Sequence, residues 1–86
     1  MKTYAVKYAK SALKELKKID RKQQVKIIRV IQKLGENPRA GNVRPMVGVS
    51  SWRLRVGDYR VIYDILDREL VVQIIRVCHR RGVYRK

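Results

Sequence analysis

The sequence predicts an α+β domain in which a two-helix hairpin packs on a small, largely antiparallel β-sheet, in the order β-α-α-β-β-β. Three observations predict this class: a run of alternating apolar and basic residues, two segments with apolar residues at helical spacing, and an apolar stretch near the C-terminus. The 86 residues are enough for a single domain over residues 1–86. Its core must come from one face of the sheet and one stripe of each helix.

The run from Trp52 to Tyr63 predicts a β-hairpin, because Gly57-Asp58 is a dipeptide of the kind that closes a two-residue loop. With that loop, Arg55 lies opposite Arg60, and one face of the hairpin is apolar: Trp52, Leu54, Val56, Tyr59, Val61 and Tyr63. The other face carries Arg53, Arg55 and Arg60. Like charges directly opposite each other repel. This face therefore indicates a phosphate-binding site rather than a requirement of folding.

The segment before residue 36 predicts one strand and two helices. Thr3 to Tyr8 alternates loosely, as a short strand does. A first helix is expected over 9–18, with its apolar residues at Ala9, Ala12, Leu13, Leu16 and Ile19. Asp20 and Gln23 form a capping box for a second helix, and Gly35 is expected at its C′ position. The apolar stripe of this helix is expected at Val25, Ile28, Ile31 and Leu34, widened by Ile27 and Val30.

The rest of the chain predicts a loop and two more strands. Glu36 to Ser51 is rich in proline and glycine and is expected to be irregular, although it also carries Arg39 and Arg44. A turn is expected at Asp67-Arg68-Glu69. The strand from Leu70 to Cys78 is the most apolar and is expected at the centre of the sheet. Strand parity puts the next two residues on opposite faces: His79 and Arg80.

The charge indicates a polyanionic partner. Twenty-two Lys and Arg against seven Asp and Glu give a formal charge of +15. Nucleic acid comes first among the partners, followed by an acidic protein and an anionic membrane surface. All but one of the lysines lie at or before Lys33, whereas most arginines lie at or after Arg44. Since arginine suits bidentate phosphate contacts, the second half is where recognition is expected.

Several classes of site are excluded by the residues present. Cys78 is the only cysteine, which excludes an intrachain disulfide and fits a reducing cytoplasm. One cysteine and one histidine cannot supply a metal site, and no glycine-rich phosphate loop is present, so we expect no cofactor. The serines lack the context of a triad, and the carboxylates are expected to cap helices or make turns. No apolar run has the length of a signal peptide or a membrane span.

The remaining inventory fits cleavage of RNA. An arginine supplies electrostatic stabilisation rather than proton transfer, which leaves His79 and Tyr84 as candidate proton carriers. RNA supplies its own nucleophile, the ribose 2′-hydroxyl. The enzyme then needs only to align that group, neutralise the phosphorane and move two protons.

Two segments, Trp52–Tyr63 and Arg76–Tyr84, resemble the signature of the RelE/ParE toxin superfamily. With the Asn37-Pro38-Arg39 loop, the resemblance covers nearly the whole chain. It implies a type II toxin of the RelE branch, which comprises ribosome-dependent ribonucleases that cut mRNA in the ribosomal A site and are neutralised by a cognate antitoxin. The ParE branch shares the fold and poisons DNA gyrase, and it is the first alternative. A plain nucleic-acid-binding module is the second.

The resemblance also assigns expected roles to site residues. Arg53 and Arg55 match the paired basic positions of the second strand, and Arg60 matches the phosphate-binding arginine of the third. The C-terminal arginine and the base-stacking tyrosine are matched by Arg80 and Tyr84, and His79 lies where members have a basic residue or histidine. RelE carries lysines at the first two positions, one of them a proposed general base. Since arginine is a poor base, that role falls here to His79 or Tyr84.

Overall fold

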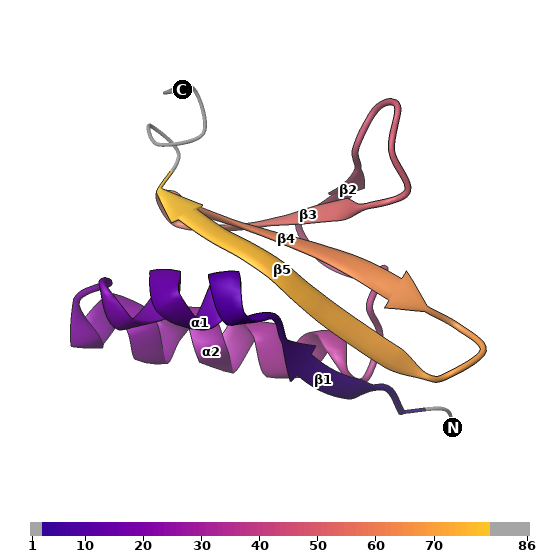
Figure 1. Ribbon diagram of the computed structural model, residues 1–86, viewed down its shortest axis with the longest axis horizontal. Helices are drawn as coiled ribbons and strands as arrows, with labels where there is room; N and C mark the ends of the chain where they lie inside the picture. Colours follow the sequence, from indigo (N-terminus) through magenta and orange to yellow (C-terminus); the bar gives the residue numbers. More distant parts are fainter. Residues whose placement is uncertain (1–2, 80–86) are drawn as a thin grey trace.

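The structure, a computed structural model, describes residues 3–79. These residues form two helices and five strands: β1 (Ala5–Tyr8), α1 (Lys10–Lys17), α2 (Arg21–Leu34), β2 (Val43–Pro45), β3 (Trp52–Val56), β4 (Tyr59–Leu66) and β5 (Val71–His79). The strand order is β1-β5-β4-β3-β2, and all neighbours are antiparallel except the parallel pair β1 and β5. Both helices lie on one side of the sheet (Figure 1). The predicted α+β architecture is therefore confirmed.

Strand β2 corrects the expectation that the whole segment from residue 36 to 51 is irregular. Val43 lies opposite Leu54 and Arg44 lies opposite Arg53, so β2 extends the sheet by one short edge strand. The backbone N–H of Arg55 also donates to the carbonyl of Asn42, at 3.1 Å. The element order is thus β-α-α-β-β-β-β, with an arginine added beside the hairpin.

The hairpin β3–β4 has the register that its sequence predicts. Arg55 lies opposite Arg60, and the loop is Gly57-Asp58, with Gly57 at a φ of 58° that favours glycine. The expected apolar face points to the helices. Its members are fully or partly buried: Trp52, Leu54, Val56, Tyr59, Val61 and Tyr63.

Strand β5 is interior but not central, because it lies between β1 and β4 whereas β4 is the middle strand. Its register against β4 shifts once: Ile62 pairs with Arg76, but Tyr63 pairs with Ile74. The extra residue makes a β-bulge, which reverses the alternation of faces beyond it. As a result, Val77 returns to the buried core three residues after Ile74.

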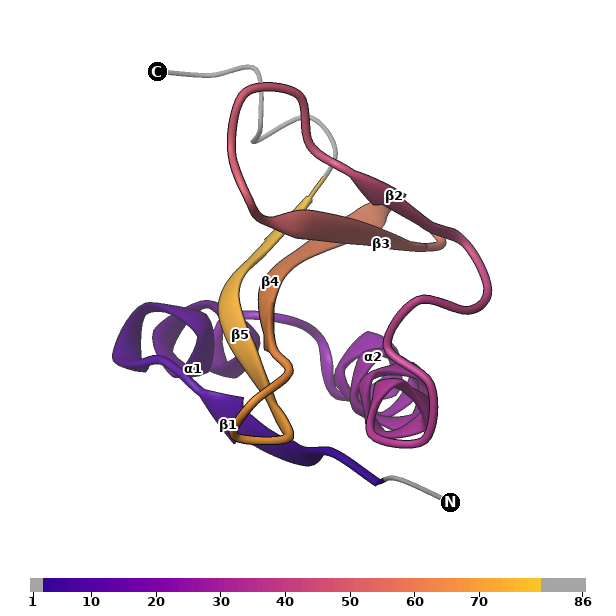
Figure 2. The same ribbon diagram turned by 90° about the vertical axis from the view of Figure 1, so that its right-hand side faces the viewer.

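The hydrophobic core lies between the sheet and the two helices. Helix α1 lies beside β5 (Figure 2). Helix α2 contacts β1 and β3. The helices contribute Ala12, Leu16, Ile27, Ile31 and Leu34 as buried residues. Two members of the expected stripes are half exposed instead: Leu13 at 45% and Val25 at 48%. The buried stripe of α2 is therefore centred on Ile27 and Ile31.

Both ends of α2 differ in detail from expectation. Asp20 occupies the N-cap position, but its side chain makes no capping hydrogen bond, so the capping box is not formed. Gly35 is right-handed at a φ of −63° and is not a left-handed C′ residue. Its lack of a side chain serves close packing, because a Cβ there would lie 2.9 Å from the carbonyl oxygen of Tyr4. The Tyr4 N–H donates to the Gly35 carbonyl at 2.6 Å, which joins β1 to the end of α2.

Glu15 of α1 covers the edge of β5 where β1 has ended. Its carboxylate accepts a hydrogen bond from the Val77 backbone N–H at 2.7 Å and two from the Arg76 guanidinium at 2.8 and 3.0 Å. The hydrogen bonds to Glu15 raise the pKa of Arg76. The Val77 N–H, which has no strand partner at this edge among residues 3–79, is thereby satisfied by a charged acceptor, which fixes the last residues of β5 against the helix.

Candidate nucleic-acid interface

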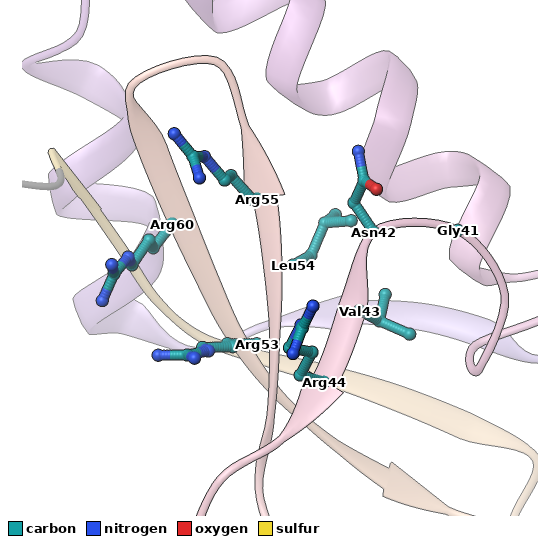
Figure 3. Close-up of a pocket in the computed structure, with 8 residues that line it drawn as sticks. All are labelled: Gly41, Asn42, Val43, Arg44, Arg53, Leu54, Arg55 and Arg60. Carbon is teal, nitrogen blue, oxygen red and sulfur yellow. The ribbon is translucent and has the colours of Figure 1, made fainter.

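Four arginines line a hollow on the face of the sheet that points away from the helices. They come from three neighbouring strands: Arg44 from β2, Arg53 and Arg55 from β3, and Arg60 from β4. The hollow has a volume of about 730 Å³ and is also lined by Gly41, Asn42, Val43 and Leu54. Figure 3 shows the four guanidinium groups spread over the strands, with the helices behind them. We call this feature the arginine groove.

The register arranges these arginines as two cross-strand pairs. Arg44 lies directly opposite Arg53, and Arg55 lies directly opposite Arg60. Side chains opposite each other on antiparallel strands have Cβ atoms about 4.5–5.5 Å apart, so each pair concentrates two positive charges. Both pairs lie on one face because Arg53 and Arg55 are two residues apart on β3.

No acidic side chain lies among the described residues that line the arginine groove. Within residues 3–79, Arg44, Arg53 and Arg55 make no ion pair or hydrogen bond with another side chain and are exposed to solvent. A concave surface with charge of one sign focuses the field and attracts a polyanion. The arrangement therefore fits a phosphodiester backbone.

Arg44 is the residue of this groove that the sequence interpretation missed. The sequence predicts an irregular segment over residues 36–51, and this prediction assigns Arg44 to no face of the sheet. The sequence signal for Arg44 is the alternation in Val43-Arg44-Pro45. This segment pairs antiparallel with Trp52-Arg53-Leu54, which has the same alternation. A three-residue edge strand that contains proline gives too weak a pattern to be recognised on its own.

His79 lies away from the groove. It pairs with Tyr59, whose side chain is on the helix face, and the two rings make an edge-to-face contact with centroids 5.2 Å apart. The residue that shares the groove face beside Arg60 is Cys78. Burial raises the pKa of the Cys78 thiol, which keeps it protonated at neutral pH. The other predicted site residues, Arg80 and Tyr84, lie outside the described residues.

Arg39 lies in a separate cluster with Asp67, Tyr4 and Trp52, and its role there is structural. The Arg39 guanidinium donates to both oxygens of Asp67, at 3.3 and 2.8 Å, and lies 5.8 Å from the ring centroid of Trp52. The Tyr4 hydroxyl donates to the same carboxylate at 2.6 Å. These hydrogen bonds raise the pKa of Arg39, chiefly through Asp67. The cluster ties the loop after α2 to the β4–β5 turn, in agreement with the structural role that the sequence predicts for Asp67.

Tyr63 provides a second anchor for the same loop. Its ring is fully buried and its hydroxyl donates to the Pro38 carbonyl at 2.6 Å. Burial raises the pKa of Tyr63 to about 12, so the phenol stays neutral and remains a donor. Together with Arg39, this contact fixes the chain that leads into β2 and thereby places Arg44.

Within residues 3–79, histidine, cysteine and acidic side chains form no cluster of three that could hold a metal ion. In the same part of the chain, neither helix is long and apolar enough to cross a membrane.

Comparison with known proteins identifies close likeness over most of the chain. The family model described as the ParE toxin of the type II toxin-antitoxin system parDE matches residues 6–84. An Escherichia coli protein named "Putative RelE-like toxin protein" is 28% identical over 79 residues, which are 90% of this chain and 83% of that protein.

Solved structures agree with this likeness. A chain of the toxin-antitoxin complex RelBE2 from Mycobacterium tuberculosis is 25% identical, with a TM-score of 0.83 over 90% of this chain and 98% of that one. A chain of the archaeal RelE-RelB complex from Pyrococcus horikoshii is 27% identical, with a TM-score of 0.79 over 91% and 96%.

Proposed function

The chain belongs to the RelE/ParE superfamily of type II toxins, and from that premise we propose that it is a ribosome-dependent mRNA endoribonuclease that inhibits translation. The observation that supports the nuclease is the arginine groove, because two repelling arginine pairs are retained on one exposed face. A folded domain gains nothing from that repulsion. A phosphodiester bound there relieves it.

The proposed reaction is attack of a ribose 2′-hydroxyl on the adjacent phosphate. It leaves a cyclic or 3′-phosphate on one product and a 5′-hydroxyl on the other. Arg60 and Arg80 hold the phosphate, while Arg53 and Arg55 neutralise the negative charge that grows on its oxygens in the transition state. Tyr84 stacks on a base of the mRNA and orients the nucleotide.

The described residues of the groove include no side chain suited to proton transfer. Arginines hold their protons, and the Cys78 thiol beside Arg60 is protonated. His79, one of the two candidates, contacts Tyr59 on the other face of the sheet. We therefore favour Tyr84 as the proton carrier over His79. A site with a weak general base depends on alignment, which ordered ribosomal RNA supplies, and near-attack alignment is worth about 7–11 kcal/mol at most.

The alternative function is a ParE-like inhibitor of DNA gyrase without nuclease activity. The family model that matches the chain is described as a ParE toxin, which keeps this alternative in view. The deciding experiment maps mRNA 5′ ends after brief expression and measures gyrase supercoiling in parallel. New 5′ ends in translated codons with normal supercoiling support the nuclease. Unchanged mRNA ends with reduced supercoiling replace it with the gyrase inhibitor.

Ribosome dependence is tested with purified components. We expect cleavage of mRNA on programmed ribosomes and almost none of the same mRNA free in solution. Equal cleavage of both substrates would refute the dependence.

We further propose a cognate antitoxin whose acidic or amphipathic segment covers Arg53, Arg55 and Arg60. Relatives have been crystallised as RelB–RelE complexes, and desolvated arginines require charged partners. Charge reversal at Arg55 should weaken neutralisation, and an acidic-to-basic change in the antitoxin should restore it. A complex that inhibits the toxin while leaving the arginine groove open would contradict this assignment.

A further inference from the structure

The spacing of the two arginine pairs indicates how many phosphates of the substrate the groove binds. Arg53 and Arg55 are two residues apart on β3, which is about 6.5–7 Å along the strand. The pairs Arg44–Arg53 and Arg55–Arg60 also lie on opposite sides of β3, about 4.8 Å apart across the sheet, so their centres are about 8 Å apart. Because arginine side chains are long, guanidinium groups at this separation reach successive phosphates along an extended strand of nucleic acid. The two pairs therefore form two steps of one track.

Charge also favours two phosphates over one. A single phosphodiester carries one negative charge, whereas the groove presents four arginines and its lining contains no carboxylate. One phosphate at the Arg55–Arg60 pair would leave the repulsion between Arg44 and Arg53 in place. A second phosphate at Arg44 relieves it, with guanidinium groups suited to bidentate contacts.

Resting on the proposed function, we propose that the arginine groove binds two successive phosphates of the mRNA, with the scissile one at Arg55–Arg60, a neighbour at Arg44, and Arg53 between the two phosphates. The order follows from β5. Cys78 lies opposite Arg60, so the last described residues of β5 lie next to that pair. Arg44 lies on the outer edge strand, far along the track.

Arg44 is thus a positioning residue for the reaction. It contacts a phosphate that does not react, and contacts of this kind fix the register of the strand. Its removal should weaken binding and leave the rate at saturation unchanged. This separates it from Arg60, whose contact strengthens as the transition state forms.

The first experiment needs no cleavage. The affinity of a short single-stranded oligoribonucleotide is measured against salt for the wild type, for Arg44→Gln and for the matched control Arg68→Gln, which removes an exposed arginine in the β4–β5 turn. For a single strand, each phosphate contact adds about 0.7 to the steepness with which the logarithm of the binding constant falls against the logarithm of the salt concentration. We expect Arg44→Gln to lower the slope by about that amount and Arg68→Gln to leave it unchanged. An unchanged slope for Arg44→Gln would overturn the inference.

The second experiment uses single-turnover cleavage on programmed ribosomes. A methylphosphonate replaces one of the two phosphates next to the scissile phosphate. The ribose whose 3′-oxygen carries the methylphosphonate also receives a 2′-O-methyl group. The 2′-hydroxyl that attacks the scissile phosphate lies on a different ribose and is left in place. In the wild type, one of the two replacements should raise the toxin concentration at half-maximal rate about tenfold. The same replacement should have no added effect in Arg44→Gln and the full effect in Arg68→Gln. If the methylphosphonate caused its full effect in Arg44→Gln as well, the two phosphates would not be bound as proposed.

The two experiments fail in different ways. If the wild type did not cleave mRNA but Arg44→Gln still had a reduced salt slope, the nuclease proposal would be refuted. The proposal that the groove binds two phosphates would remain. Normal cleavage, with Arg44→Gln identical to the wild type in both measurements, would refute the track and leave the nuclease.

Discussion

The arginines of this protein are used in two opposite ways. Arg39 and Arg76 each bind a carboxylate at 2.8 Å, from Asp67 and Glu15. Arg44 and Arg55, in the arginine groove, lie opposite other arginines. Exposure does not explain the difference, because the side chains of Arg39 and Arg76 are themselves 46% and 51% exposed.

The comparison shows where the few acidic residues are placed. The chain has seven of them for 22 basic residues. Asp67 and Glu15 hold the arginines that join elements of the fold, the loop after α2 to the β4–β5 turn and α1 to β5. Among the described residues, no acidic side chain lines the groove, so the repulsion between Arg44 and Arg53 is left for a ligand to relieve. Variants of the groove arginines should therefore lose activity without losing stability, and variants of the arginines paired with Asp67 and Glu15 should lose stability without losing activity.

The largest effect is expected for Arg60→Ala. Loss of one preorganised donor to a developing oxyanion lowers the rate about 10²–10³-fold, so single-turnover cleavage on programmed ribosomes should fall by that amount. The melting temperature should change little. A folded Arg60→Ala protein that cuts at the wild-type rate would refute the assignment of the groove as the active site.

Arg39→Ala should show the reverse behaviour. It removes a half-exposed ion pair, worth about 0.2–1 kcal/mol, and a cation–π contact with Trp52, worth about 0.5–1 kcal/mol. We expect a loss of about 1 kcal/mol in the free energy of unfolding, which lowers the melting temperature by about 4–8 °C. Cleavage below that temperature should stay within twofold of the wild type. Strong loss of activity without loss of stability would place Arg39 in the site.

Tyr63→Phe tests the second anchor of the same loop, through pH. Below pH 10 the variant should lose about 0.5–1.5 kcal/mol of stability, since the Pro38 carbonyl loses its donor. The pKa of Tyr63 is about 12 in the folded protein and about 10 when unfolded. Its contribution is therefore complete below pH 10 and is lost as the pH rises from 10 to 12. Denaturant unfolding should show the two proteins converging over that range, and a constant difference would contradict it.

The hairpin and the two helices were predictable because their signals are local. Gly57-Asp58 fixes the loop, and the alternation around it fixes the register, so Arg55 and Arg60 could be placed opposite each other. Strand β2 could not be predicted in this way. Its three residues include Pro45, and it is defined by pairing with β3 across a loop.

The position of His79 shows a second limit of the sequence. The β5 sequence has no alternation that would reveal a bulge, because apolar residues occupy both odd and even positions, including Val71, Val72, Ile74 and Ile75. Unbroken alternation from Ile74 would place His79 on the groove face. The bulge at Ile75 places it beside Tyr59 instead. A close approach that only the tertiary structure creates likewise explains Gly35, where the Tyr4 carbonyl leaves no room for a Cβ.

The smallest effect is also the most direct test of the repulsion itself. Arg55→Gln removes one charge from the pair with Arg60, and like charges directly opposite each other cost about 0.2–1 kcal/mol. The variant should therefore be more stable than the wild type by a few tenths of a kcal/mol in low salt.

Salt should remove that gain. The Debye length falls from about 10 Å at 0.1 M to about 3 Å at 1 M, so the repulsion in the wild type is screened and the two proteins become equally stable. Arg68→Gln, which changes the same charge in an exposed turn outside the groove, should gain nothing at either salt concentration. Denaturant unfolding at both concentrations measures the difference. If Arg55→Gln were less stable than the wild type in low salt, Arg55 would belong with Arg39 and Arg76, which stabilise the fold. The distinction between these arginines and those of the arginine groove would then be wrong.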